Sequence, residues 1–253
     1  MTVVVALVDP PREGLVLPEL FESTQLSPSD ATALYEAFVK DLCHAAAASG
    51  GDLLLNYRPE DLLPEEYRTG DDVEAEVEAI AADALSDAAL DEARIEVQVG
   101  STQSARIGNT VTHLLDEETV DSVTVSDPAA PLRGRQHIDS IAMKLRRSPL
   151  VLAPASRGRV HTAAFTDTID FDGALTTPEL VTLTDRARDA GHDVDFAPQQ
   201  TLVETHDDLV GLLSEIRARQ TAGRWVPPHT ASAVDDLGLR IDTAGDEPRV
   251  EVD

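Results

Sequence analysis

The sequence contains one cysteine, Cys43, and only two lysines, Lys40 and Lys144, among 253 residues. A single cysteine excludes a disulfide within the chain, and its helical apolar surroundings favour a packed thiol over a nucleophile. No apolar run approaches the roughly 20 residues of a membrane-spanning helix. The apolar start Thr2–Val8 ends at Asp9 and is too short for a signal peptide. These absences predict a cytoplasmic protein without a membrane partner.

Positive charge is also scarce. Asp and Glu total 47 and Lys and Arg total 20, which gives a formal net charge of −27. Such a surface argues against a nucleic-acid partner, because phosphates require a basic face. An acidic surface with almost no lysine is typical of proteins from an extremely salty cytoplasm.

Apolar runs alternate with amphipathic helical patterns along most of the chain. Strands are predicted at 2–8, 52–57, 94–99, 120–126, 150–153 and 193–197. Helices are predicted at 28–49, 71–90, 104–116, 134–147, 177–190 and 206–222. This alternation predicts an α/β fold with a mainly parallel central sheet and helices on both faces.

Two further features complete the predicted architecture. The runs 160–165 and 168–171 flank Thr166-Asp167 and predict a small β-hairpin. Residues 225–253 follow a break at Trp225–Pro228 and predict a weakly structured extension. We therefore expect one α/β domain over 1–224 and a C-terminal extension over 225–253.

The central unit, Val120 to Phe165, reverses the charge of the chain. Residues 133–159 hold seven of the 20 basic residues and a single acid, Asp139. Two apolar runs bracket a helical segment and predict a βαβ unit, whose ligands bind beyond the carboxyl ends of the strands. Asp127, Arg157 and Arg159 follow those ends, so we expect a site there.

Several motifs, in order along residues 2–215, resemble those of one family. The matching positions are Pro11, Gly14, Leu20, Leu34–Asp41, Ser126-Asp127, Pro154 and Gly158. The layout resembles the nucleotide-diphospho-sugar transferase (GT-A) fold. It is most similar to an uncharacterised group of glycosyltransferase-like proteins, some linked to arsenosugar biosynthesis, of which this chain would be a divergent, haloarchaeal-type member.

The resemblance implies a divalent metal, Mg²⁺ or Mn²⁺, that neutralises a diphosphate leaving group between carboxylates. Asp127 matches one family carboxylate, and Glu204 is the only other matched candidate ligand. Ala129–Leu132 replace the second carboxylate, and Arg157 stands where the family has an acid. The metal motif is thus degenerate. Arginine can bind phosphate bidentately and replace the metal's electrostatic role.

Each candidate residue also has a structural interpretation. Asp127 is either a pocket carboxylate or a cap of the turn at Pro128. Phosphate binding is favoured over surface ion pairing for Arg157 and Arg159. Arg12 lies in the first loop, where the family binds nucleotide, but beside Glu13. Arg106 could reach the pocket or face solvent with its helix.

Two residues of the central unit are expected to be structural. Arg133 is interpreted as a cap or surface residue of the helix that follows it. His161, which alternates with Val160 on a predicted strand, is interpreted as a structural histidine.

The sequence predicts a transferase-like protein that binds a nucleotide or another small phosphorylated ligand. Asp127 is the candidate catalytic residue, with glycosyl or nucleotidyl transfer as the reaction. Arg157, Arg159, Arg12 and Arg106 are the candidate phosphate ligands. The alternative is a non-catalytic binding or scaffolding protein on the same fold. The sequence leaves the donor, the acceptor and the oligomeric state open.

The acidic excess predicts that the chain depends on salt. At ~1 M salt the Debye length is about 3 Å, so repulsion between acids is screened there and is strong in dilute buffer. We expect the chain to lose structure on dialysis to low salt, as measured by circular dichroism. An unchanged melting temperature in dilute buffer would contradict this expectation.

Overall fold

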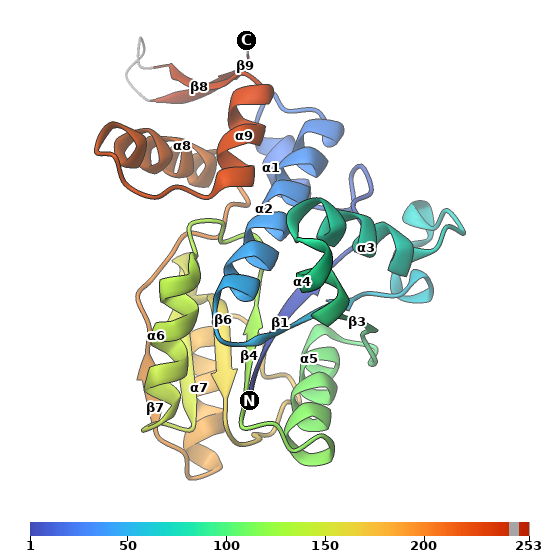
Figure 1. Cartoon of the computed structure of the whole chain (residues 1–253), viewed down its shortest axis with the longest axis vertical. Coiled ribbons are helices and arrows are strands. Elements are labelled where there is room, and N and C mark those ends of the chain that lie inside the picture. The colour runs from blue at the N-terminus through green and yellow to red at the C-terminus, as the bar shows by residue number, and fades with distance from the viewer. Residues whose placement is uncertain (243–247, 253) are drawn as a thin grey trace.

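The computed structural model describes residues 1–242 and 248–252, which fold around one seven-stranded sheet (Figure 1). The strand order is β3-β2-β1-β4-β6-β5-β7. Neighbouring strands are parallel except at β6, which is antiparallel to both β4 and β5. The strands are β1 Thr2–Val8, β2 Asp52–Tyr57, β3 Arg94–Val97, β4 Ser122–Ser126, β5 Leu150–Pro154, β6 Val160–Phe165 and β7 Val194–Phe196. The predicted, mainly parallel α/β sheet is confirmed.

Helices cover both faces of the sheet. One apolar cluster packs α2 and α3 on one face, and another packs α5 and α7 on the opposite face. The helices are α1 Pro18–Ser23, α2 Pro28–Ala48, α3 Val73–Ala84, α4 Asp87–Glu92, α5 Gln103–Thr112, α6 Arg135–Leu145, α7 Glu179–Asp189, α8 His206–Thr221 and α9 Pro228–Asp236. Within residues 1–242 and 248–252, none of the helices has the length and apolarity to cross a bilayer.

Local signals place the first strand and the longest helix. Val3, Val4 and Val5 of β1 are fully buried, which is typical of a strand covered on both faces. At the start of α2, the Ser27 hydroxyl accepts from the Asp30 amide and the Asp30 carboxylate accepts from the Ser27 amide, a capping box. Both elements follow the predicted ranges.

The predicted hairpin of 160–165 with 168–171 is wrong. β6 lies between β4 and β5 and pairs with both, so neither of its edges is free for the following segment. Ile169 and Phe171 instead pack into the apolar cluster beneath the sheet, where the Phe171 ring lies 5.5 Å from that of Phe165.

The predicted helix over 71–90 is divided. α3 ends at Ala84, its C-cap Leu85 is extended, and the Ser86 hydroxyl accepts from the Ala89 amide to begin α4. A serine at this position competes with the helix by capping a new one.

Residues 225–253 carry more structure than the sequence indicates. They contain α9 and a hairpin of β8, Leu239–Asp242, with β9, Arg249–Val252. Figure 1 shows this segment with α8 beyond one end of the sheet. The division at 224/225 itself stays a prediction.

Asp41 of α2 anchors the start of α9. Its carboxylate is 3 % exposed and accepts from the His229 amide at 3.0 Å and from the Thr230 amide and hydroxyl at 2.7 and 2.6 Å. Burial raises the pKa of Asp41, while the Thr230 hydrogen bonds oppose the rise. The first amides of a helix have no intrahelical acceptor, so this carboxylate caps α9 from another helix.

We expect Asp41→Asn to lower the free energy of unfolding by about 2 kcal/mol, because the amide group turns one acceptor into a donor facing buried N–H groups. Urea unfolding in about 2 M KCl measures the change. Asp91→Asn on the exposed face of α4 is the control and should stay within about 0.5 kcal/mol of the wild type. Equal effects of the two variants would contradict the anchoring role.

Candidate functional site

Charged side chains gather where the parallel strands end. Asp9, Arg58 and Asp127 directly follow β1, β2 and β4. Because β6 is antiparallel, its first residues come to the same edge, and Arg159 precedes it. Ligands of open α/β sheets bind at this edge. The strand-end cluster consists of Asp9, Arg58, Arg106, Asp127, Arg159, Glu179 and Glu204.

Asp9 and Arg58 form an ion pair. Nη2 of Arg58 donates to Oδ2 of Asp9 at 3.0 Å, and Nε lies 2.8 Å from Oδ1. The Asp9 amide donates to the Tyr35 hydroxyl at 2.8 Å. Burial raises the pKa of Asp9, although Arg58 and Arg106 oppose the rise. Sequence reasoning missed this pair, although each residue directly follows a predicted strand.

Arg106 reaches the strand-end cluster from α5. Its Nε donates to Gln98 Oε1 at 2.7 Å. Burial, followed by the nearby charge of Arg58, lowers the pKa of Arg106. Asn109 and His113, which follow Arg106 along the same helical segment, contact other groups: Asn109 donates to the Val99 carbonyl, and His113 lies 3.2 Å from Glu118. Of these three polar residues, Arg106 is the one placed at the candidate site.

Arg159 is surrounded by three carboxylates. Its Nη1 forms a very short ion pair with Glu204. Its Nε lies 3.9 Å from Glu179, and its Nη2 lies 4.0 Å from Asp127. Burial raises the pKa of both Glu179 and Glu204, and Arg159 partly opposes each rise. Three acids around one guanidinium leave an excess of negative charge.

Asp127 uses its two carboxylate oxygens differently. Oδ1 accepts from the Ala129 amide at 2.9 Å, which closes the turn at Pro128. Oδ2 faces Arg159 at 4.0 Å. The two interpretations of Asp127 are therefore compatible, since one oxygen caps the turn and the other faces the cluster.

Arg157 has a different environment from Arg159. It lies in the short turn Ser156–Gly158 with φ of 60°, in the left-handed region, and its side chain is exposed. Among the described residues, no side chain or carbonyl forms a hydrogen bond or ion pair with it. Arg157 is thus an available cation beside the strand-end cluster.

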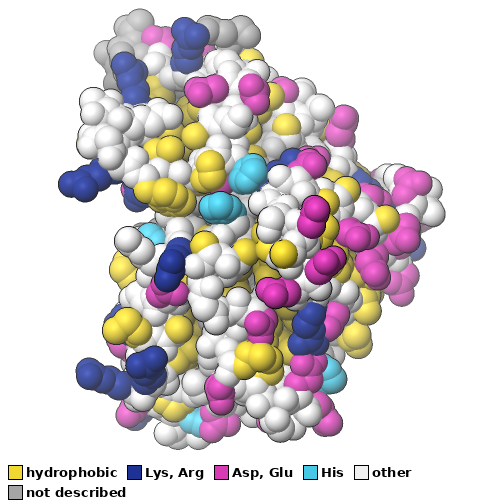
Figure 2. Space-filling view, in the orientation of Figure 1, with side chains coloured by type: hydrophobic (Ala, Val, Ile, Leu, Met, Phe, Trp, Pro, Cys, Tyr) yellow, Lys and Arg dark blue, Asp and Glu magenta, His cyan; other side chains and the backbone are white. Residues whose placement is uncertain are grey.

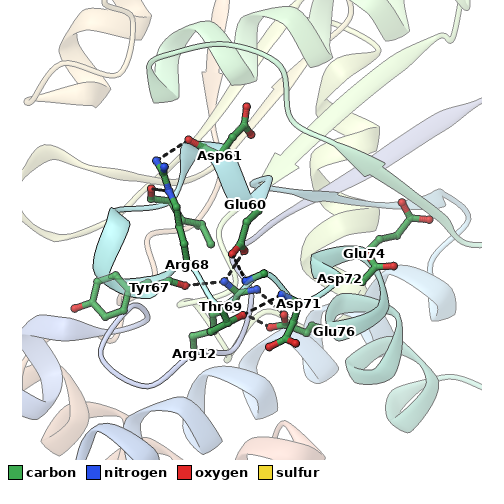
Figure 3. A network of polar contacts seen from close by, with 12 residues as sticks. Arg12, Glu60, Asp61, Tyr67, Arg68, Thr69, Asp71, Asp72, Glu74 and Glu76 are labelled. Atoms are coloured by element: carbon green, nitrogen blue, oxygen red, sulfur yellow. Dashed lines mark hydrogen bonds and ion pairs between the residues drawn. The ribbon is translucent and has the colours of Figure 1, made fainter.

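Arg12 does not belong to the strand-end cluster, and its guanidinium donates to residues of segment 60–76 (Figure 3). Nη1 donates to Glu60 at 2.5 Å and to the Tyr67 carbonyl at 2.6 Å, while Nη2 and Nε donate to Glu76 at 2.6 and 3.2 Å. The residue is 9 % exposed. Arg12 therefore fixes the first loop to segment 60–76, and its donors are not available to a phosphate.

Arg133 is a core residue and not the expected cap or surface residue of α6. It is 2 % exposed, with Nη2 donating to the Asp127 carbonyl at 2.8 Å and Nη1 to the Thr162 hydroxyl at 2.9 Å. Burial lowers the pKa of Arg133 to about 10. Burial and the adjacent Arg133 lower the pKa of His161 to about 3, so His161 is a neutral core residue.

The carboxylates do not fit a divalent cation in this arrangement. Within the described residues, no group of three or more His, Cys, Asp or Glu side chains could hold a metal. The predicted pair of ligands, Asp127 and Glu204, shares Arg159 instead. The arginine supplies the positive charge that a metal would bring.

Neither a family model nor a curated protein matches the sequence. Solved structures do match. One is a candidate nucleotide-diphospho-sugar transferase from Desulfovibrio desulfuricans G20, with a TM-score of 0.73, 19 % identity, and coverage of 93 % of this chain and 95 % of that one. This likeness establishes the nucleotide-diphospho-sugar transferase-like fold. The narrower family resemblance stays a prediction.

Two further solved structures are more distant. Rv0371c from Mycobacterium tuberculosis H37Rv has a TM-score of 0.47 and 15 % identity, and the match covers 84 % of this chain and 97 % of that one. A 4-diphosphocytidyl-2C-methyl-D-erythritol synthase from Anaerococcus prevotii DSM 20548 has a TM-score of 0.48 and 12 % identity, with coverage of 83 % and 94 %.

The raised pKa of Glu179 predicts a dependence of stability on pH. Its contribution is fully present below the unfolded-state pKa of 4.5 and is lost as pH rises through the higher folded-state pKa. Glu179→Gln removes this loss, so the variant should gain stability relative to wild type as pH rises. Unfolding free energies between about pH 4 and pH 7 measure the difference. With Glu92→Gln as the exposed control, a pH-independent difference for Glu179→Gln would contradict the prediction.

Proposed function

We propose that the strand-end cluster and Arg157 bind a nucleotide or another small phosphorylated ligand without a divalent cation. One observation carries the proposal: at the carboxyl edge of a nucleotide-diphospho-sugar transferase-like sheet, a guanidinium occupies the centre of the carboxylate group. Beside it, Arg157 is exposed, and its side chain has no partner among residues 1–242 and 248–252. Arginine forks match phosphate oxygens in pairs.

The three arginines have distinct roles in this proposal. Arg157 makes the first contact with phosphate, since it gives up no ion pair to do so. Arg159 lies deeper and is shared with Glu204, so a phosphate must compete with that carboxylate. Arg106, whose Nε bonds a neutral glutamine, adds charge on the side of Asp9.

The reaction we propose is glycosyl or nucleotidyl transfer. The oxygen of an acceptor hydroxyl forms a bond to the sugar carbon or to the phosphorus. The bond from that carbon or phosphorus to the leaving phosphate oxygen breaks, and the hydroxyl proton passes to Asp127. The leaving group, a nucleoside diphosphate or a pyrophosphate, takes the electron pair and gains negative charge. Arginines positioned on that charge stabilise the transition state.

A non-catalytic binding protein on the same fold is the second candidate. One observation favours it: Oδ1 of Asp127 accepts from the Ala129 amide, and Oδ2 faces Arg159. Both oxygens therefore already have partners other than an acceptor hydroxyl. Ligand binding is common to the two candidates, and turnover of a bound nucleotide sugar separates them.

We expect nucleoside diphosphate sugars or triphosphates to raise the melting temperature without added metal. A ligand at 100 times its dissociation constant stabilises the folded chain by about 2.7 kcal/mol. A thermal-shift panel with and without Mn²⁺, in about 2 M KCl to screen the acidic surface, measures this effect. Arg157→Ala should reduce the shift.

Arg147→Ala is the matched control, because Arg147 is also an exposed arginine and lies at the end of α6. It should leave the shift unchanged. If no nucleotide changes the melting temperature, the proposal is wrong. If the melting temperature changes only with Mn²⁺, the metal-free form of the proposal is wrong.

A further inference from the structure

A second groove lies outside the strand-end cluster. It has a volume of about 560 Å³ and lies between the first turn of α6, residues 134–137, and Arg219, Arg224 and Trp225 at the end of α8 and beyond it. Figure 2 shows the molecule hollowed between the part formed by α8 and α9 and the body of the sheet. Within the described chain, none of the residues that line this groove belongs to the strand-end cluster.

The groove is positively charged, although the chain carries a net charge of −27. Three arginines line it and no carboxylate does, among the residues described. Arg135 pairs with Asp139, and Arg219 pairs with Glu215. The Arg224 amide donates to the Arg219 carbonyl at 2.8 Å, whereas its exposed side chain has no hydrogen-bond or ion-pair partner in the described chain. Its guanidinium is therefore available to an anion.

The first turn of α6 adds donors on the opposite wall. This helix has 11 residues, and its capping residue is Gly134, whose amide donates to His137 Nδ1 at 3.3 Å. In the described part of the chain, the amides of Arg135 and Gln136 have no acceptor. Amides at a helix start carry partial positive charge and bind anions.

Trp225 forms a flat aromatic wall beside these donors. It is the only tryptophan of the chain and is 47 % exposed. A Cβ atom at Gly134 would lie 3.1 Å from Cη2 of its indole ring. The glycine thus lets the ring approach the first turn of α6 closely. Exposed tryptophan is costly in water and stacks well on planar rings.

We propose that this groove is a second ligand site, for a small molecule that joins a planar aromatic ring to a phosphate or carboxylate group. The ring stacks on Trp225, and the anionic group binds Arg224 and the free amides of α6. This site is independent of the proposed function, because the two sites share no residue. Arg133, which donates to the Asp127 carbonyl, lies in the loop that separates them.

The single tryptophan makes the proposal directly measurable. Titration with AMP, followed by Trp225 fluorescence at a KCl concentration that keeps the chain folded, should give a saturable change. Adenosine lacks the phosphate group and inorganic phosphate lacks the aromatic ring. Each should bind at least about tenfold more weakly than AMP, because the loss of one charge-assisted contact alone raises the dissociation constant by about that factor. Arg224→Gln should weaken AMP binding by a similar factor.

Two controls make the outcome unambiguous. The Arg224 side chain has no partner in the described chain, so Arg224→Gln should keep the wild-type melting temperature. Arg147→Gln should keep wild-type AMP binding. Trp225→Leu should lose AMP binding in equilibrium dialysis.

If AMP changes no fluorescence, or binds Arg224→Gln as tightly as wild type, the proposal fails. If Arg157→Ala alone abolishes the response, the ligand binds the strand-end cluster, and the second site is refuted while the proposed function stands.

Discussion

The reversal of one strand determines how this chain arranges its charges. β6 is antiparallel between β4 and β5, so its first residues lie where β1, β2 and β4 end. Arg159 is thereby brought to Asp127, although 31 residues lie between them in the sequence. Were β6 parallel to β4, Arg159 would lie at the opposite edge. The candidate site therefore depends on strand direction before it depends on any single contact.

The acidic chain uses its few cations mainly as internal counter-ions. Arg12, Arg58 and Arg159 each hold carboxylates from separate segments. An ion pair that is partly removed from water is costly to break, because the remaining charge loses its partner. Arg157 and Arg224 differ from these because their side chains form no hydrogen bond or ion pair among the described residues. An anion that binds either of these two side chains therefore breaks no existing ion pair.

Apolar runs and helix caps, which are local in sequence, predicted most of the helices and strands. The order of the strands in the sheet depends on pairing between distant segments. The valine run of β1 and the capping box of α2 can be identified within a few residues of sequence. The place of β6 depends on which strands lie beside it, and a sequence of alternating residues does not specify this. The site follows the same division: Asp127, Arg159 and Glu204, which the sequence singled out, lie together, whereas Glu179 comes from the start of α7 without any local signal.

The position of Arg159 has a consequence for any ligand at this edge. With three carboxylates nearby, its field is largely cancelled, and a phosphate entering there meets Asp127, Glu179 and Glu204 as well. In the proposed site, binding therefore begins at Arg157, which is exposed. Burial has already raised the pKa of Glu179 and Glu204, so an approaching anion would raise both further. Phosphate binding and proton uptake by these two acids are thus expected to be coupled.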